Sequence, residues 1–178
     1  MTLVTKTHER IIGIDPGSHR TGWGVIDAKG TKMTAVAAGV VELRATHAFE
    51  RRLRDLFEEL QGIFAKYKPS AIAIEDIFHA RHAQSSLKLG HARGVILLAA
   101  ALWEAPLAAY PPALVKKTIT GSGRAEKDQV AELVMVLLSL TQKPPVDATD
   151  ALAVAITHAR SYALLGVTKR IGQARISP

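Results

Sequence analysis

The sequence contains no cysteine in its 178 residues. This absence excludes a disulfide framework, a thiol nucleophile and a zinc site with cysteine ligands, and it is compatible with a reducing cytosol. Long apolar runs are also missing, since the longest, residues 95–103, is far shorter than the roughly 20 residues that span a bilayer. The first nine residues are polar and lack the apolar core of a signal peptide. We therefore expect a soluble, cytoplasmic protein.

Internal repeats and low-complexity linkers are absent as well. A chain of this length gives room for one well-buried domain, and its 48% apolar and 22% charged residues are typical of a globular protein. We expect a flexible extension over residues 1–9, one domain over residues 10–165, and a basic, disordered tail over residues 166–178.

The charge is strongly basic, with 23 Lys and Arg against 16 Asp and Glu, a net charge of +7. Clustered cations gain free energy by releasing counterions from phosphates, so a nucleic acid is the leading interpretation of this excess. A generically basic soluble protein is the alternative, and a membrane surface is a weaker one.

The hydrophobic pattern predicts an α/β domain. Three strands joined by short turns come first and indicate an antiparallel meander. A long amphipathic helix then begins at Thr46 and stops before Pro69. We expect a five-stranded mixed sheet with helices on both faces. The predicted strands are residues 10–15, 21–27, 32–43, 71–74 and 107–110, and the predicted helices are residues 46–68, 83–103, about 125–140 and about 147–165, with one more after Pro112.

Four acidic residues lie where a catalytic metal site would need them. Asp15 and Glu75 end the first and fourth predicted strands, and such ends can lie side by side at the carboxyl edge of a mixed sheet. Asp147 and Asp150 are three residues apart at the start of the last helix and therefore share one of its faces. Converging carboxylates repel one another, which a protein tolerates mainly when a cation lies between them.

These oxygen ligands favour Mg²⁺ or Mn²⁺ over zinc, and two such ions can clamp the attacking and leaving oxygens of a phosphodiester. Each acid also has a simpler explanation. Asp147 and Asp150 can be an N-cap and a first-turn partner of the helix dipole. Asp15 can be a turn residue, and Glu75 can be solvated at a strand end.

Six blocks of the sequence occur in a familiar order and spacing between about residue 10 and residue 160. They are residues 13–25 (GIDPGSHRTGWGV), 73–78 (AIEDIF), 86–94 (SLKLGHARG), 115–118 (VKKT), 121–130 (GSGRAEKDQV) and 147–159 (DATDALAVAITHA). Together they resemble the RuvC family of bacterial Holliday junction resolvases. The resemblance implies a ribonuclease H-like fold and symmetric, metal-dependent cleavage of two strands of a four-way DNA junction during recombination and repair, leaving 5′-phosphate and 3′-hydroxyl ends.

The resemblance also assigns roles to single residues. It makes Asp15, Glu75, Asp147 and Asp150 the catalytic, metal-binding acids, which would hold two Mg²⁺ ions or Mn²⁺ in their place. Some members of the family carry histidine at the third of these positions, and this chain keeps Asp147. Lys127 matches a family lysine that supports catalysis, where it could steady charge on the scissile phosphate.

Residues 76–127 carry seven Lys or Arg against three acids, a local charge of 7 − 3 = +4. This stretch is a candidate phosphate track, although ordinary solvated helix faces would look the same. By resemblance, Phe78 stacks on bases or wedges the branch point, whereas a core position under the second helix is its simpler explanation. The candidate DNA-binding residues are Phe78, Arg81, Lys88, Lys116, Lys117, Arg124 and Lys127.

The second predicted helix carries small residues and leucines at helical spacing. By itself this stripe indicates a core-facing helix. In the resembled family the region contributes to a homodimer interface, and a two-fold dimer would place two identical sites against opposed strands of a junction. The resemblance also implies a branch-migration helicase as partner. The stripe consists of Leu87, Gly90, Gly94, Leu97, Leu98 and Ala101.

Three other functions compete with junction cleavage. The Asp-Pro-Gly turn also resembles the phosphate loop of sugar kinases and actin-like ATPases, but those need two domains and this chain has room for one. A related family of ribosomal-RNA-processing nucleases shares the opening motif, but the match through Lys127 and Asp147 argues against it. A junction-binding scaffold without chemistry would normally lack one of the four acids, and all four are present.

Overall fold

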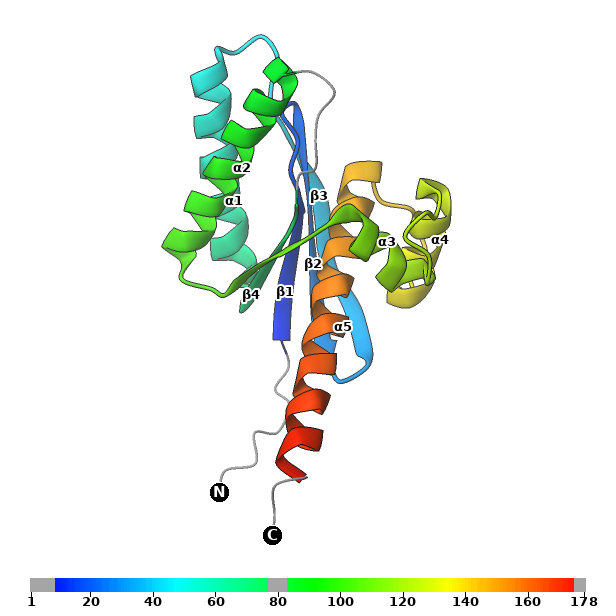
Figure 1. Ribbon diagram of the computed structural model, residues 1–178. Coiled ribbons are helices and arrows are strands. Elements are labelled where there is room, and N and C mark those ends of the chain that lie inside the picture. The colour runs from blue at the N-terminus through cyan, green and yellow to red at the C-terminus, as the bar shows by residue number, and fades with distance from the viewer. Residues whose placement is uncertain (1–8, 77–82, 175–178) are drawn as a thin grey trace.

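The computed structural model describes residues 9–76 and 83–174 (Figure 1). The predicted five-stranded mixed sheet is confirmed, with the strands in the order β3-β2-β1-β4-β5. β1, β2 and β3 form the expected antiparallel meander, and β4 and β5 add to β1 in parallel. The strands are β1 (Glu9–Asp15), β2 (Arg20–Lys29), β3 (Lys32–Glu42), β4 (Ala71–Glu75) and β5 (Leu107–Tyr110).

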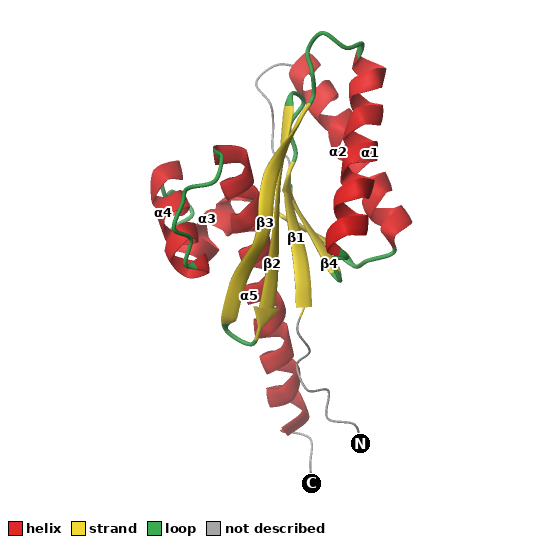
Figure 2. Cartoon of the chain, turned by 180° about the vertical axis from the view of Figure 1, so that it is seen from behind, coloured by secondary structure: helices red, strands yellow, loops and turns green. Residues whose placement is uncertain are grey.

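The helices lie on both faces of the sheet. α1 and α2 pack together on one face, and α5 crosses the other with α3 and α4 beside it, as Figures 1 and 2 show from opposite sides. No helix in the described ranges is long and apolar enough to cross a membrane. The helices are α1 (Phe49–Tyr67), α2 (Ala83–Trp103), α3 (Pro112–Thr120), α4 (Lys127–Leu138) and α5 (Val146–Ala174).

β1 is the central strand of the sheet, and together with β4 it positions Asp15 and Glu75. Ile12 and Ile14 are fully buried, as expected for a strand covered on both faces. Ile14 lies opposite Ile74 in the parallel register of β1 and β4. The residues that follow them therefore leave the sheet from neighbouring strands at the same edge.

The two faces of the sheet carry side chains of different size. The face toward α1 and α2 is built from large aliphatic residues, among them Ile12, Ile14, Val25, Ile72 and Ile74. The face toward α5 is built largely from glycine and alanine, including Gly13, Gly22, Gly24, Ala71 and Ala73.

Gly13 and Gly22 let α5 touch the backbone of the sheet. A Cβ atom at Gly13 would lie 2.0 Å from the carbonyl oxygen of Ala151, and one at Gly22 would lie 1.9 Å from that of Asp147. Neither distance is compatible with a side chain, so glycine is required for this close approach. Because Gly22 pairs with Asp15 across β1 and β2, the contact brings the start of α5 directly over the end of β1.

Some helix ends differ from their predicted positions. α1 begins at Phe49 rather than Thr46, because a turn closed by His47 N–H donating to the Arg44 carbonyl (3.0 Å) comes first. α4 is shorter than expected and stops where Ser139 adopts a left-handed conformation. α5 continues nine residues past the predicted end at Leu165, so the predicted end of this helix is wrong. The predicted domain limits stay predictions.

The core-facing interpretation of the stripe on α2 is wrong. The buried residues of this helix are Ala92, Ile96, Ala99 and Ala100. The stripe lies on another face, where Leu87 and Leu98 are largely exposed and where Gly90 and Gly94 have open space beside them.

Candidate active site at the carboxyl edge of the sheet

The four predicted acids come from three elements that meet at one edge of the sheet. Asp15 and Glu75 are the last residues of β1 and β4, and Asp147 and Asp150 lie in the first turns of α5. All four are partly buried. The parallel register of the two strands and the glycine contacts under α5 are what bring them together.

The pKa of Asp15 reflects its burial and the acids around it. Burial raises the pKa of Asp15 to about 8, and the negative charges of Glu75, Asp150 and Asp147 add to the shift. Burial raises the pKa of Glu75 as well, and the charge of Asp150 adds to that shift.

Two basic side chains neutralise the acids of α5. The Arg20 Nε lies 3.2 Å from a carboxylate oxygen of Asp147, and the Lys127 Nζ lies 3.3 Å from one of Asp150. The carboxylate of Asp150 raises the pKa of Lys127, which is therefore a cation. Lys127 is the first residue of α4, so this ion pair joins α4 to α5 at the site.

A cleft of about 310 Å³ opens at this edge of the sheet. Its polar lining comes from three of the acids and two lysines, while Pro112, Val115, Val130 and Ala153 supply apolar walls. The polar residues are Asp15, Glu75, Asp150, Lys116 and Lys127. The cleft therefore places carboxylates and ammonium groups together in a space large enough for a phosphate and its immediate surroundings.

The donor set fits a hard divalent cation. It contains carboxylate oxygens and no sulfur or imidazole, which is the ligand chemistry of Mg²⁺ and Mn²⁺. The repulsion felt by Asp15 is the kind that a bound cation relieves. Within the described residues no three acid or histidine side chains form a ready set of metal ligands, and the ion pairs to Arg20 and Lys127 account for the orientation of two of the acids.

The other predicted DNA-binding residues are spread around the cleft. Lys117 and Arg124 are exposed on α3 and on the loop before α4, without lining the cleft. Lys88 is exposed on α2, where it borders a separate hollow with Phe49 and His91. Phe78 and Arg81 lie outside the described residues.

Sequence reasoning missed Arg20. Arg20 pairs with Asp147 and also lies 3.8 Å from a carboxylate oxygen of Glu42 on β3. The sequence signal that could have identified Arg20 is its position at the start of β2, shortly after the Asp-Pro-Gly turn.

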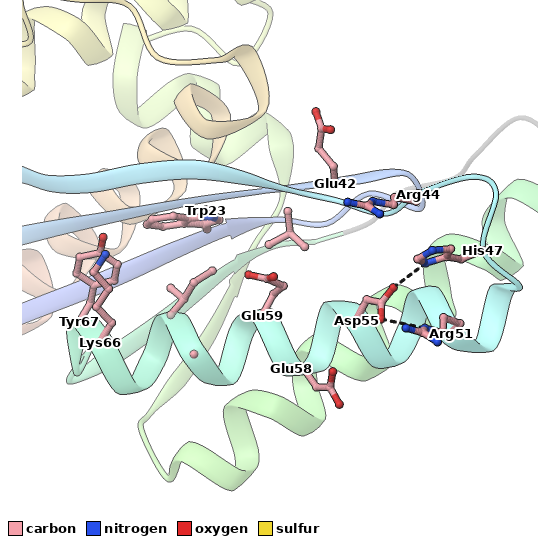
Figure 3. Close-up of a pocket in the computed structure, with 13 residues that line it drawn as sticks. Trp23, Glu42, Arg44, His47, Arg51, Asp55, Glu58, Glu59, Lys66 and Tyr67 are labelled. Atoms are coloured by element: carbon pink, nitrogen blue, oxygen red, sulfur yellow. Dashed lines mark hydrogen bonds and ion pairs between the residues drawn. The ribbon is translucent and has the colours of Figure 1, made fainter.

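A larger hollow, of about 720 Å³, lies on the other side of the sheet, between α1 and strands β2 and β3 (Figure 3). At one end the carboxylate of Asp55 lies 3.0 Å from the His47 Nδ1 and 3.6 Å from the Arg51 Nε. At the other end the rings of Trp23 and Tyr67 pack with their centroids 5.6 Å apart. None of the four acids lines this hollow, so its size does not make it the active site.

The chain is similar to a family of DNA nucleases. The family described as “Crossover junction endodeoxyribonuclease RuvC” matches residues 11–158. A protein of this name from Sorangium cellulosum is 48% identical over 149 residues, covering 84% of this chain and 83% of the relative. Another, from Beijerinckia indica, is 47% identical over 169 residues, covering 93% of this chain and 97% of the relative.

Solved structures lead to the same family. RuvC of Thermus thermophilus, in complex with a Holliday junction substrate, superposes with a TM-score of 0.84 at 33% identity, covering 88% of this chain and 96% of that one. A yeast mitochondrial Holliday junction resolvase shares the fold, with a TM-score of 0.71 at 15% identity, covering 98% of this chain and 89% of that one. The ribonuclease H-like fold is thereby confirmed, and the chain belongs to the RuvC family of crossover junction endodeoxyribonucleases.

Proposed function

We propose that this chain is an endonuclease that resolves four-way DNA junctions by metal-dependent hydrolysis of one phosphodiester bond in each of two strands. The observation that carries the proposal is the convergence of four acids with Lys116 and Lys127 at one edge of the sheet, in a chain of this family. The Thermus thermophilus relative is described in complex with a Holliday junction substrate, and we extend that substrate to this chain.

Asp15, Glu75, Asp147 and Asp150 are the proposed metal-binding acids. They would hold Mg²⁺, or Mn²⁺ as a substitute, as two ions in each site, in accordance with their oxygen-only chemistry. The chemistry supplied there by divalent cations is the activation of water and the stabilisation of the departing 3′ oxygen. The products are a 5′-phosphate and a 3′-hydroxyl, which a ligase can rejoin.

Lys127 is the proposed catalytic cation. Its side chain is largely exposed and pairs only at 3.3 Å with Asp150, so it can turn toward a phosphate that enters the cleft. A fixed positive charge at that place stabilises the charge that builds up on the phosphate during hydrolysis. Lys116, which also lines the cleft, gives a second contact of the same kind.

The remaining basic residues are proposed to guide the DNA backbone to the cleft. Lys88, Lys117 and Arg124 are exposed, and phosphate contacts of this kind make binding strongly dependent on salt. Arg81 and the branch-point role of Phe78 complete the proposed interface. A flat response of binding to salt would contradict it.

We propose that the protein works as a homodimer. Leu87 and Leu98 on α2 line a shallow hollow of about 780 Å³ together with Gly90 and Gly94, and exposed apolar surface of this kind is typical of protein interfaces. A two-fold axis through it would pair two sites with the two strands to be cut. A branch-migration helicase is the proposed partner, and the bacterial cytoplasm, at the nucleoid, is the proposed place of action.

The test is cleavage of an end-labelled synthetic four-way junction, with linear duplex and an RNA hairpin as comparison substrates. We expect paired, symmetric nicks in Mg²⁺ or Mn²⁺ and none in EDTA. Asp15→Asn should abolish nicking and retain junction binding. Asp128→Asn, which changes an exposed acid beside Lys127, should leave nicking unchanged and serves as the matched control.

Each alternative function predicts a different result. A scaffold binds the junction tightly and does not nick it with either metal on any junction sequence. A ribosomal-RNA-processing nuclease prefers the hairpin, and a kinase-like protein turns over ATP without DNA. Sedimentation of the wild-type protein tests the dimer separately, and a monomer at all concentrations would contradict it.

A further inference from the structure

Arg52 is a buried cation on the side of the sheet opposite to α5. It projects from α1, and only 6% of its surface is exposed. Its Nη2 donates a hydrogen bond to the carbonyl oxygen of Ser18 and lies 3.3 Å from the Nδ1 of His19. The guanidinium carbon lies 5.7 Å from the centre of the Phe49 ring, which fixes the side chain from one side.

Stability alone does not explain a buried arginine at this position. A guanidinium keeps its charge in proteins, and burying a charge without an opposite partner is unfavourable. In the described ranges no carboxylate pairs with Arg52, and its Nε has no hydrogen-bond partner. An apolar residue would fill the same space without this penalty, so the bond to Ser18 is the feature that distinguishes arginine here.

The segment that Arg52 holds joins two parts of the active site. Residues 16–19 run from Asp15, at the end of β1, to Arg20, which pairs with Asp147. At one end of this segment the buried Thr21 hydroxyl donates to the Gly17 carbonyl at 3.2 Å.

At the other end of the segment, the N–H of Leu43 donates to the carbonyl of His19 at 2.8 Å. Ser18, between these two attachments, has its carbonyl bound by Arg52. The three attachments come from β2, from Leu43 directly after β3, and from α1, and only the one from α1 carries a charge.

We infer that Arg52 is a positioning residue for the nuclease reaction, one that holds residues 16–19 and through them Asp15 at one end and the Arg20–Asp147 pair at the other. The inference rests on the proposed function for its catalytic part. Without Arg52 the segment keeps its two flanking attachments but loses the middle one. Asp15 and the Arg20–Asp147 pair then shift relative to each other, and a misplacement of about 1 Å at reacting groups can lower a rate about 100-fold.

The test compares Arg52→Ala and Arg52→Lys with Arg54→Ala. Arg54 is on the same helix, is exposed, and pairs with Glu58 at 2.7 Å, so its replacement removes a similar charge from the surface. Three quantities are measured: the single-turnover cleavage rate at saturating enzyme, the Kd for the junction, and amide hydrogen exchange of residues 16–21. Thermal melting gives the folded fraction of each variant.

We expect folded Arg52→Ala to cut the junction about 100-fold more slowly than the wild type and to bind it with the same Kd. Its amide hydrogens at residues 16–21 should exchange faster than in the wild type, whereas exchange in the rest of the chain should stay the same. Millimolar guanidinium should restore part of the rate, because it can enter the space left by the side chain and donate to Ser18. Arg52→Lys should be intermediate, and Arg54→Ala should behave as the wild type.

Three results would overturn the inference: a wild-type rate in folded Arg52→Ala, a loss of rate that merely follows the folded fraction, or exchange that rises uniformly along the chain. If Arg52→Ala does not fold, Arg52→Lys decides by the same three readouts. A wild-type protein that does not nick junctions would overturn the proposed function, whereas hydrogen exchange would still decide whether Arg52 holds this segment.

Discussion

The two faces of the sheet hold their helices in different ways. Toward α1 and α2 the contact is made by large aliphatic side chains, which interdigitate and can adjust to one another. Toward α5 part of the contact is made by backbone against backbone, because Gly13 and Gly22 leave no side chain between the sheet and the helix. A side-chain layer tolerates small shifts of a helix, while direct backbone contact does not.

The active site lies on the face toward α5, where small shifts of the helix are tolerated least. Asp147 and Asp150 are carried by α5, and their distance from Asp15 depends on how closely that helix lies on the sheet. The comparison therefore separates two effects of mutation. Changes on the α5 face should affect cleavage and stability together, whereas truncation of the aliphatic side chains on the other face, away from Arg52, should affect stability alone.

The largest effect on cleavage is expected from Gly13→Ala. The new Cβ would meet the Ala151 carbonyl at 2.0 Å, which is backbone and cannot rotate away, so α5 must lift. We expect a loss of about 1–3 kcal/mol in unfolding free energy and a cleavage rate about 100-fold lower in the folded protein. Urea denaturation and single-turnover cleavage measure the two, and an unchanged rate per folded molecule would contradict the role given to this contact.

Ile12→Ala tests the opposite face at the neighbouring residue. Ile12 is fully buried toward α1 and α2, so its truncation should lower the unfolding free energy by about 2–5 kcal/mol. Junction cleavage per folded molecule should stay near that of the wild type, because no site residue rests on this side chain. A rate that drops as far as in Gly13→Ala would remove the distinction between the two faces.

A smaller effect is expected from pH, through His158 on the α5 face. Burial lowers the pKa of this histidine, whose Nδ1 lies 2.8 Å from the Tyr110 hydroxyl. The unfolded chain therefore takes up a proton first as the pH falls through about 6.5, and the folded protein follows only at lower pH. The contribution of His158 to the unfolding free energy should therefore decrease below about pH 6.5 and level off once the folded form is protonated.

The measurement is urea denaturation from pH 7.5 down to pH 5 for the wild type and His158→Gln, with cleavage left aside because the acids of the site titrate too. The variant should lose this part of the pH dependence. Identical slopes in both proteins would mean that His158 is not the group responsible.

The smallest effect, and one of opposite sign, is expected from Gly62→Ala. Gly62 lies within α1, with nothing within 4 Å of the Cβ that alanine would add. Alanine is favoured over glycine inside a helix by roughly 0.5–1 kcal/mol, so the melting temperature should rise by a few degrees. A fall in melting temperature would show that the space around a glycine does not predict the effect of an added Cβ in this protein. It would also weaken the argument made for Gly13→Ala.

Much of this fold could be predicted from the sequence, because the relevant signals are local. Apolar runs located the strands, and the predicted bounds of α2 and β5 agree with the structure. The placement of Asp15 and Glu75 side by side followed from two strand ends and the rule that parallel strands meet at one edge. Helix ends were less predictable, since the turn before Phe49 and the continuation past Leu165 depend on backbone bonds that composition does not reveal.

What the sequence could not provide were the long-range contacts. The stripe on α2 has the spacing of a core-facing helix, and only the packing of α1 against another face shows that it is exposed. The pairing of Arg20 with Asp147 joins residues 127 positions apart, since 147 − 20 = 127. Both features arise from how elements meet in space rather than from any segment alone.

The parallel pairing of β1 and β4 fixes the backbone spacing of Asp15 and Glu75. Neighbouring strands in a sheet are held about 4.8 Å apart by their hydrogen bonds, whatever side chains they carry. Because Asp15 and Glu75 end two such strands in matching register, the spacing between their backbones is set by this repeat and is independent of core packing. Heating or a mutation that lifts α5 therefore moves Asp147 and Asp150 away from the sheet. Asp15 and Glu75 keep their backbone spacing until the sheet itself unfolds.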